Sequence, residues 1–278
     1  MSTKKVWFVT GASKGLGLAL VQKLLAEGYS VAATSRSLKS FENSIQSSER
    51  FLPLEMDLLN ENNVKKAITE TVEKFGRVDV IVNNAGYGQL GTLEELTDEE
   101  SRKNFDTNVF GSLNVIRQAM PFLRNQNSGY IINVASIGGI TGAFPGWGVY
   151  CATKFAVAGF TESLAYEVAE FGINATVVYP GYFRTNFLDS GSMTLPENPI
   201  SEYTAARTVE AKHKEEINGN QPGDPDKAAA TFIKLAEMQK PPVHFVMGTD
   251  AVGLAKEKMK MLDADIESTL ELSNSTDF

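Results

Sequence analysis

Short runs of apolar residues alternate along the chain with longer stretches in which apolar positions recur at helical spacing. A continuous apolar run is typical of a strand that is buried on both faces of a parallel sheet. Seven such runs predict strands, over residues 6–10, 29–35, 51–56, 78–82, 130–135, 173–179 and 243–247.

The intervening stretches carry the start and stop signals of helices. Thr97-Asp98-Glu99-Glu100 has the sequence of a capping box, and Asp224-Pro225 places proline at a first helical position. We expect the helix that begins at Thr97 to end near Pro121, because proline cannot continue the backbone hydrogen bonds. The pattern predicts helices over residues 18–25, 61–75, 97–120, 150–171 and 224–238 and from 249 onward, with a polar helical stretch after Arg36.

This alternation of strands and helices predicts an α/β fold. Crossovers of this kind give a doubly wound, seven-stranded parallel sheet with helices on both faces. Without a repeat or linker, residues 1–278 are expected to form a single domain. The pattern breaks over residues 187–222, which contain a short helical piece near 201–217 and are expected to form a mobile lid. A helical tail follows over residues 249–272.

Composition and charge narrow the class of protein. The 278 residues are 42% hydrophobic and 22% charged, which is ordinary for a globular protein. A net charge of -8 without a Lys/Arg-rich run argues against nucleic acid and membranes as partners. The single cysteine, Cys151, excludes an internal disulfide and suits a reducing compartment, so we expect a cytoplasmic protein. We see neither a signal peptide nor a run near the ~20 apolar residues of a membrane span.

Candidate functional residues gather where the predicted strands end. The turn from Gly11 to Gly17 joins the first strand to the first helix, and such a turn can hold a pyrophosphate with backbone N–H groups. An ordinary βα turn is the alternative, whereas a P-loop does not fit because no Gly-Lys-Ser/Thr follows at the required spacing. Ligands of parallel sheets bind beyond the carboxyl ends of the strands. Further candidates at such ends are Arg36, Asp57, Asn83 to Gly86, Ser136 and Pro180-Gly181.

Tyr150 and Lys154 are four positions apart on a predicted helix and therefore share one face. A free phenol has a pKa of ~10, and a nearby cation lowers it, so the pair suits general acid/base chemistry. Alone, it equally describes a half-buried ring beside a solvated charge. Ser136 ends a strand fourteen positions upstream, and the Gly-rich loop between them allows both hydroxyls to reach one substrate oxygen. Cys151 is expected to be a small buried residue rather than a reactive thiol.

Together these motifs resemble the short-chain dehydrogenase/reductase family over residues 5–248, which implies a Rossmann fold. The family signature T-G-x-x-x-G-x-G matches Thr10 to Gly17, and N-N-A-G matches Asn83 to Gly86. The catalytic Asn, Ser, Tyr and Lys of the family match Asn108, Ser136, Tyr150 and Lys154. Two departures are a Ser136–Tyr150 interval one residue longer than is common, and Tyr182-Phe183 where a smaller aliphatic residue usually follows the P-G motif.

The resemblance implies a role for each matched residue. Tyr150 exchanges a proton with the substrate oxygen, Lys154 lowers its pKa and binds the nicotinamide ribose, and Ser136 orients the substrate. Asn108 kinks its helix and holds a water that links Lys154 to solvent. No metal ion is expected. The implied cofactor-binding residues are Gly11, Ser13, Lys14, Gly15, Leu16, Arg36, Asp57, Leu58, Asn84, Ala85, Gly86, Tyr150, Lys154, Pro180, Gly181 and Thr185.

The residues after the second strand bear on the choice of cofactor. An acid there hydrogen-bonds the ribose 2′-OH of NAD, whereas an arginine accommodates the 2′-phosphate of NADP. The sequence reads Thr34-Ser35-Arg36-Ser37, with no acid before Glu42, and Lys14 adds a cation within the glycine turn. Both cations could also be plain surface charges, but together they favour NADP, with NAD as the less favoured cofactor.

We expect an NADP-dependent oxidoreductase that transfers a hydride between nicotinamide and a ketone, aldehyde or secondary alcohol. A sugar-nucleotide epimerase or dehydratase shares the Tyr/Lys pair, but 278 residues hardly leave room for its larger substrate domain. A catalytically silent NADP-binding regulator is a second alternative, against which the intact catalytic set argues. The faces of helices 98–120 and 150–171 could form a homo-oligomer or belong to the core. The residues expected to line a pocket for apolar or aromatic carbonyls are Phe144, Trp147, Tyr182, Phe187 and Leu188.

Overall fold

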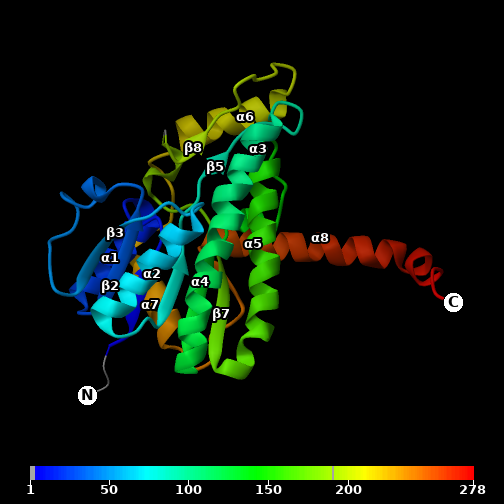
Figure 1. Ribbon diagram of the computed structural model, residues 1–278. Coiled ribbons are helices and arrows are strands. Elements are labelled where there is room, and N and C mark those ends of the chain that lie inside the picture. The colour runs from blue at the N-terminus through cyan, green and yellow to red at the C-terminus, as the bar shows by residue number, and fades with distance from the viewer. Residues whose placement is uncertain (1–3, 190) are drawn as a thin grey trace.

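The computed structural model describes residues 4–189 and 191–278, and a parallel sheet lies at its centre (Figure 1). The strand order is β3-β2-β1-β4-β6-β7-β9, and every neighbouring pair is parallel. All seven strands expected from the apolar runs are present, with ends that differ by one or two residues. They are β1 (Val6–Val9), β2 (Ser30–Ser35), β3 (Phe51–Glu55), β4 (Val80–Asn83), β6 (Gly129–Val134), β7 (Ile173–Pro180) and β9 (His244–Met247).

Helices cover both faces of this sheet, as the continuous apolar strands require. On one face α1 (Gly15–Ala26) and α7 (Pro225–Glu237) pack against Trp7 and Val9 of β1. On the other face α2 (Glu61–Phe75), α4 (Gly111–Gln126) and α5 (Gly148–Glu167) pack against Phe8. Successive residues of one strand therefore lie in two separate cores, which confirms the doubly wound fold.

The helix that begins after Thr97 does not end near Pro121, so that prediction is wrong. It runs as α3 (Asp98–Phe105), a π-helical turn (Asp106–Phe110) and α4, and Pro121 lies inside α4. Pro121 is exposed, whereas Ala119 and Leu123 on either side of it are fully buried. Their burial offsets the local cost of proline, about 3 kcal/mol in a helix interior. The helix ends where Asn127 adopts a left-handed conformation with φ 48°.

Other differences concern short or irregular segments. The polar stretch after Arg36 is not a regular helix but a 3₁₀ turn, Leu38–Ser40, followed by further turns. The helix predicted to reach residue 171 ends at Glu167, and a 3₁₀ turn follows at Ala169–Phe171. Two strands that the sequence did not predict, β5 (Gly88–Gln89) and β8 (Met193–Thr194), pair with each other. Two residues are too few to show a hydrophobic period.

Residues 187–222, hereafter the lid segment, contain β8, α6 (Thr204–Lys212) and a π-helical turn at His213–Ile217. After β9 the chain continues as α8 (Thr249–Asn274), which extends away from the rest of the molecule at the right of Figure 1. Over the described part of the chain, no helix combines the length and the apolar character needed to cross a membrane.

Candidate active site

A cavity of about 840 Å³ opens at the carboxyl ends of the central strands and collects almost all the predicted site residues. The carboxyl ends of β1, β2, β3, β4, β6 and β7 all contribute to its lining, because parallel strands finish at the same edge of the sheet. Every residue predicted to bind cofactor or to line the substrate pocket is part of this lining, together with Ser136. Asn108 is the exception, since it lies behind the cavity wall and is 1% exposed.

The floor of the cavity consists of the turn after β1 and the turn after β4, which are fastened together. The Oγ1 of Thr10 accepts hydrogen bonds from the backbone N–H groups of Asn84 and Ala85, both at 3.0 Å. Asn84 Nδ2 in turn donates to the carbonyls of Thr10 and Gly11, at 2.9 and 3.1 Å. A Cβ at Gly11 would lie 2.7 Å from Ala85 Cα, so only glycine allows this close approach.

The start of α1 offers free backbone donors to this cavity. Within the described part of the chain, its N-cap residue, Lys14, makes no side-chain capping hydrogen bond, so no such cap satisfies the first N–H groups of the helix. Ser13, Gly15 and Leu16 at this point all line the cavity. Uncapped N–H groups at the positive end of a helix dipole fit the pyrophosphate of a dinucleotide.

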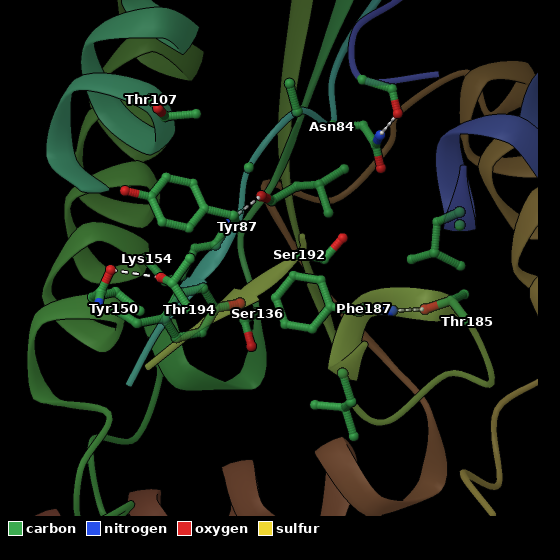
Figure 2. Close-up of a pocket in the computed structure, with 18 of the residues that line it drawn as sticks. Asn84, Tyr87, Thr107, Ser136, Tyr150, Lys154, Thr185, Phe187, Ser192 and Thr194 are labelled. Atoms are coloured by element: carbon green, nitrogen blue, oxygen red, sulfur yellow. Dashed lines mark hydrogen bonds between the residues drawn. The ribbon is translucent and has the colours of Figure 1, made fainter. Parts of the chain in front are cut away.

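Tyr150 lies in the wall opposite this turn, in the first turns of α5. Its ring packs edge-on against Trp147, with 5.3 Å between ring centroids, and contacts Phe187 at 6.1 Å. Ser136, at the end of β6, accepts a hydrogen bond from the N–H of Gly138 at 3.1 Å. A Cβ on Gly138 would lie 3.6 Å from Ser136 Oγ and 3.7 Å from Tyr150 Cε1. The two hydroxyl-bearing side chains therefore flank Gly138, and Figure 2 shows both at the cavity wall.

Lys154 lies one turn further along α5 and is 5% exposed. Its Nζ donates to the carbonyl of Val134 at 3.0 Å and lies 5.7 Å from the centroid of the Tyr150 ring. Burial lowers the pKa of Lys154 to about 8. The helical spacing thus places the amine beside the phenol, as predicted.

Burial is the largest influence on the Tyr150 phenol. Burial raises the pKa of Tyr150 above its ordinary value, and the neighbouring Ser136 hydroxyl lowers it by less. A phenolate would be poorly solvated in this wall, which is why burial raises the pKa of Tyr150 and favours the protonated phenol.

Asn108 lies in the π-helical turn between α3 and α4, which agrees with the expected distortion of this helix. Its Oδ1 accepts from the N–H of Tyr87, and its Nδ2 donates to the Tyr87 carbonyl and to Thr153 Oγ1, all at 3.0 Å. A Cβ on Gly86 would lie 2.9 Å from Asn108 Oδ1 and 3.5 Å from Lys154 Nζ. Asn108 thus fastens the turn after β4 to α5 next to Lys154.

The two cations expected near the adenosine ribose have different surroundings. Arg36 is exposed at the rim of the cavity, and within residues 4–189 and 191–278 its side chain makes no ion pair or hydrogen bond. Lys14 instead reaches the lid segment, where its Nζ donates to the carbonyl of Gly191 at 3.1 Å. Asp57 is exposed and accepts a hydrogen bond from the N–H of Leu59 at 3.0 Å.

The far wall of the cavity is largely apolar, and a polar contact there joins Tyr182 to the lid segment. Tyr182 OH lies 2.8 Å from His213 Nε2, while His213 Nδ1 lies 2.7 Å from the Val209 carbonyl. A carbonyl only accepts, so Nδ1 carries the proton and Nε2 accepts from Tyr182. Burial lowers the pKa of His213, which keeps the ring neutral. His213 could not be predicted as a site residue, because only the folded lid segment brings it to Tyr182.

The lid segment is held to the body by specific contacts. Arg207 of α6 donates from Nη2 to both carboxylate oxygens of Glu95 at 2.9 Å, and the side chain of Glu95 is fully buried. Glu95 also accepts from the N–H of Ile200 at 2.7 Å. On the cavity side, Thr194 Oγ1 donates to Gln89 Oε1 at 2.6 Å across the β5–β8 pair. Gln89 and Thr194 both line the cavity, and neither was predicted from the sequence as a site residue.

Comparison with known proteins agrees with this geometry. The family described as short chain dehydrogenase matches residues 5–194. The chain is 38% identical to Oxidoreductase BOA17 of Botryotinia fuckeliana, over 97% of this chain and 98% of the relative. It is 36% identical to the 3-ketodihydrosphingosine reductase of Bacteroides thetaiotaomicron, over 88% of each chain.

Solved structures give the same result. A short-chain dehydrogenase from Streptomyces avermitilis superposes with a TM-score of 0.91 at 33% identity and covers 100% of both chains. ElxO with NADP bound has a TM-score of 0.70 at 28% identity and covers 88% of this chain and 96% of its own. The chain belongs to the short-chain dehydrogenase/reductase family and is an oxidoreductase of the kind that uses a nicotinamide cofactor.

Proposed function

We propose that this protein reduces an apolar or aromatic ketone or aldehyde with NADPH, and that Tyr150 supplies the proton. The observation that carries the proposal is a buried Tyr150 beside Ser136 and Lys154, in one cavity with an uncapped glycine turn. A phenol that holds its proton is the form needed to donate to a carbonyl oxygen.

The residues of the chain divide the reaction between them. When bound, the reduced nicotinamide supplies a hydride to the carbonyl carbon. Ser136 donates a hydrogen bond to the carbonyl oxygen and orients it, while Tyr150 transfers its phenolic proton to that oxygen as the alcohol forms. Lys154, whose Nζ donates to the Val134 carbonyl, would hold the cofactor ribose and the phenol with its remaining N–H groups. Trp147 and Phe187 pack around the phenol and exclude water from the site of transfer.

The preference for NADPH over NADH follows from the charge at the cavity rim. Arg36 is exposed after β2, where its planar guanidinium suits a 2′-phosphate. No carboxylate lies between the end of β2 and Glu42 to favour a free 2′-hydroxyl. Lys14 is a weaker contributor in this proposal, because the Gly191 carbonyl already uses one of its hydrogen bonds.

The choice of substrate follows from the wall formed by Phe144, Trp147, Tyr182, Phe187 and Leu188. Their rings and aliphatic groups favour an apolar carbonyl over a sugar, since a sugar would leave many hydroxyls without partners. The name of the 3-ketodihydrosphingosine reductase relative describes a ketone on a long apolar chain, which supports this class.

A cofactor-plus-carbonyl screen on the purified protein tests the proposal. We expect turnover of aryl and alkyl ketones with NADPH and poor turnover of small polyols with NADP. A steep preference for polyols would overturn the substrate class. Binding of NADPH without turnover of any carbonyl would instead favour the catalytically silent regulator.

A further inference from the structure

Within residues 4–189 and 191–278, most of helix α8 has no partner. Its base is packed, because Ala251 and Ala255 are buried against Ile137 and its neighbours. From Met259 onward every residue of the helix is exposed, and Figure 1 shows this part running into solvent. A lone helix is only marginally stable in water, and most helical stability in proteins comes from packing an apolar face. The distal part of α8 would therefore be stabilised by packing against a partner.

The exposed part carries an apolar seam. Met259, Leu262 and Ile266 are 56%, 45% and 51% exposed. Their spacing of three and four continues the face of Ala251 and Ala255, which is already buried at the base. Together they follow the a and d positions of a heptad, with Met259 and Ile266 at a and with Ala255 and Leu262 at d.

The charges beside this seam are segregated along the helix. Lys256 and Lys258 occupy the e and g positions of the first heptad, and Asp263 and Asp265 occupy the same positions one heptad later. Each flank thus carries one cation followed by one anion. Charges at e and g select the partner and its orientation in coiled coils.

We propose that α8 pairs antiparallel with α8 of a second copy of this chain. Met259 of each copy then packs against Leu262 of the other. In an antiparallel pair, e meets e and g meets g, so Lys256 faces Asp263 of the second copy and Lys258 faces its Asp265. A two-fold axis repeats each contact.

The same charges exclude neighbouring registers. A shift by one heptad in one direction places Asp263 opposite Asp263 and Asp265 opposite Asp265. A shift in the other direction places Lys256 opposite Lys256 and Lys258 opposite Lys258. A parallel pair would place both bodies at the same end of the helices, whereas the antiparallel pair places them at opposite ends.

The seam is short, so the pair forms a small, reversible interface below the ~1,200 Å² of standard complexes. Its exposed ion pairs are screened by salt. This interface differs from a dimer through the α4 and α5 faces, where Phe155 and Tyr166 of α5 are exposed, as is Phe110 directly before α4. The two arrangements respond to different substitutions, which makes the proposal testable.

Charge exchange on the full chain is the test, with mass measured by analytical ultracentrifugation. Lys256→Glu/Lys258→Glu and Asp263→Lys/Asp265→Lys each create like-charge contacts, so each variant alone should dimerise at least tenfold more weakly than the wild type. An equimolar mixture restores every attractive pair and should form a heterodimer. Leu262→Glu should weaken dimerisation in every background. All these positions lie outside the cavity lining, so activity should be unchanged.

Single-cysteine cross-linking then tests the orientation, with the buried Cys151 as an unreactive background. Met259→Cys should cross-link with Leu262→Cys in a mixture more readily than either does with itself. Self-cross-linking of each variant would indicate a parallel pair and overturn the proposal. So would a monomeric wild type at high concentration, or a dimer insensitive to the charge exchanges and to Leu262→Glu, which would place the interface on α4 and α5.

Discussion

Tyr150 is a buried phenol whose ring is held by Trp147 and Phe187, so its hydroxyl can be removed without disturbing the wall. Positioned acid/base groups contribute ~10²–10⁴-fold to rate, and we expect Tyr150→Phe to lower kcat for carbonyl reduction by at least ~10²-fold. NADPH affinity, measured by fluorescence titration, should be nearly unchanged. Near-normal turnover under conditions where chemistry limits the rate would contradict the role of Tyr150.

Arg36 is exposed at the rim of the cavity, where we propose that it binds the 2′-phosphate of NADPH. A charge-assisted hydrogen bond contributes roughly 1.5–3 kcal/mol, and ~1.4 kcal/mol corresponds to a factor of ten, so we expect at least a ~tenfold preference for NADPH in kcat/KM. Arg36→Asp should reverse this preference, and rising salt should reduce it in the wild type. Lys39→Asp makes the same charge change outside the cavity lining and is the matched control. Equal use of both cofactors at low salt would leave Arg36 a surface residue.

Single residues also show where sequence reasoning stops. The cavity residues at strand ends could be predicted, because a parallel sheet fixes where its carboxyl ends meet. The pKa of Tyr150 could not, since a helical spacing places Lys154 nearby but does not reveal that burial dominates. His213, Gln89 and Thr194 could not either, because they reach the site only through contacts distant in sequence.

At the scale of elements, the strands were predictable and the irregular connections were not. A continuous apolar run predicts a strand that is buried on both faces of a parallel sheet. At Pro121, in contrast, the burial of Ala119 and Leu123 keeps the chain helical despite the proline. The strands β5 and β8 have two residues each, too few to show a hydrophobic period. They form only where the folded chain pairs the lid segment with the body.

The Arg207–Glu95 pair fastens α6 to the body, so Arg207→Met should loosen the lid segment. Breaking a fully buried ion pair costs about 3–5 kcal/mol of stability. Because Arg207 is partly exposed, we expect the free energy of unfolding, measured in urea, to fall by about 2 kcal/mol. We also expect a raised KM. Arg102→Met is the matched control, since the Arg102–Asp98 pair on α3 is exposed and its loss should change the free energy of unfolding little. Unchanged stability and KM in Arg207→Met would show that this contact does not hold the lid segment.

The same pair has a defined pH dependence. Burial acts to raise the pKa of Glu95, but hydrogen bonds from Thr92 and Ile200 and the Arg207 charge outweigh it, and the pKa is lowered. A lowered folded-state pKa contributes stability above the unfolded value, and that stability is lost as pH falls through the folded value. The difference in unfolding free energy between the wild type and Arg207→Met should therefore shrink under acid conditions.

At the scale of the whole molecule, the site is maintained at a cost to the stability of the fold. Lys154 is buried with a pKa of about 8, below the 10.5 of an exposed lysine. The unfolded chain therefore binds one more proton than the folded one between these values, so this group makes stability rise with pH across that window. Below about pH 8 the free energy of unfolding is lowered by the full cost of burying the Lys154 ammonium beside Tyr150.

Lys154→Met separates this penalty from all other titrating groups. One pKa unit corresponds to about 1.4 kcal/mol, so between pH 7 and 9.5 the unfolding free energy of the wild type should rise by about 2 kcal/mol relative to Lys154→Met. Urea unfolding of both proteins at the two pH values measures this difference, in which the titration of shared groups cancels. A constant difference would mean that Lys154 is solvated as an ordinary lysine, and the buried amine would then be no part of the site. Loss of carbonyl reduction in the same variant, together with the pH-dependent difference, would connect the stability cost to the chemistry of Tyr150.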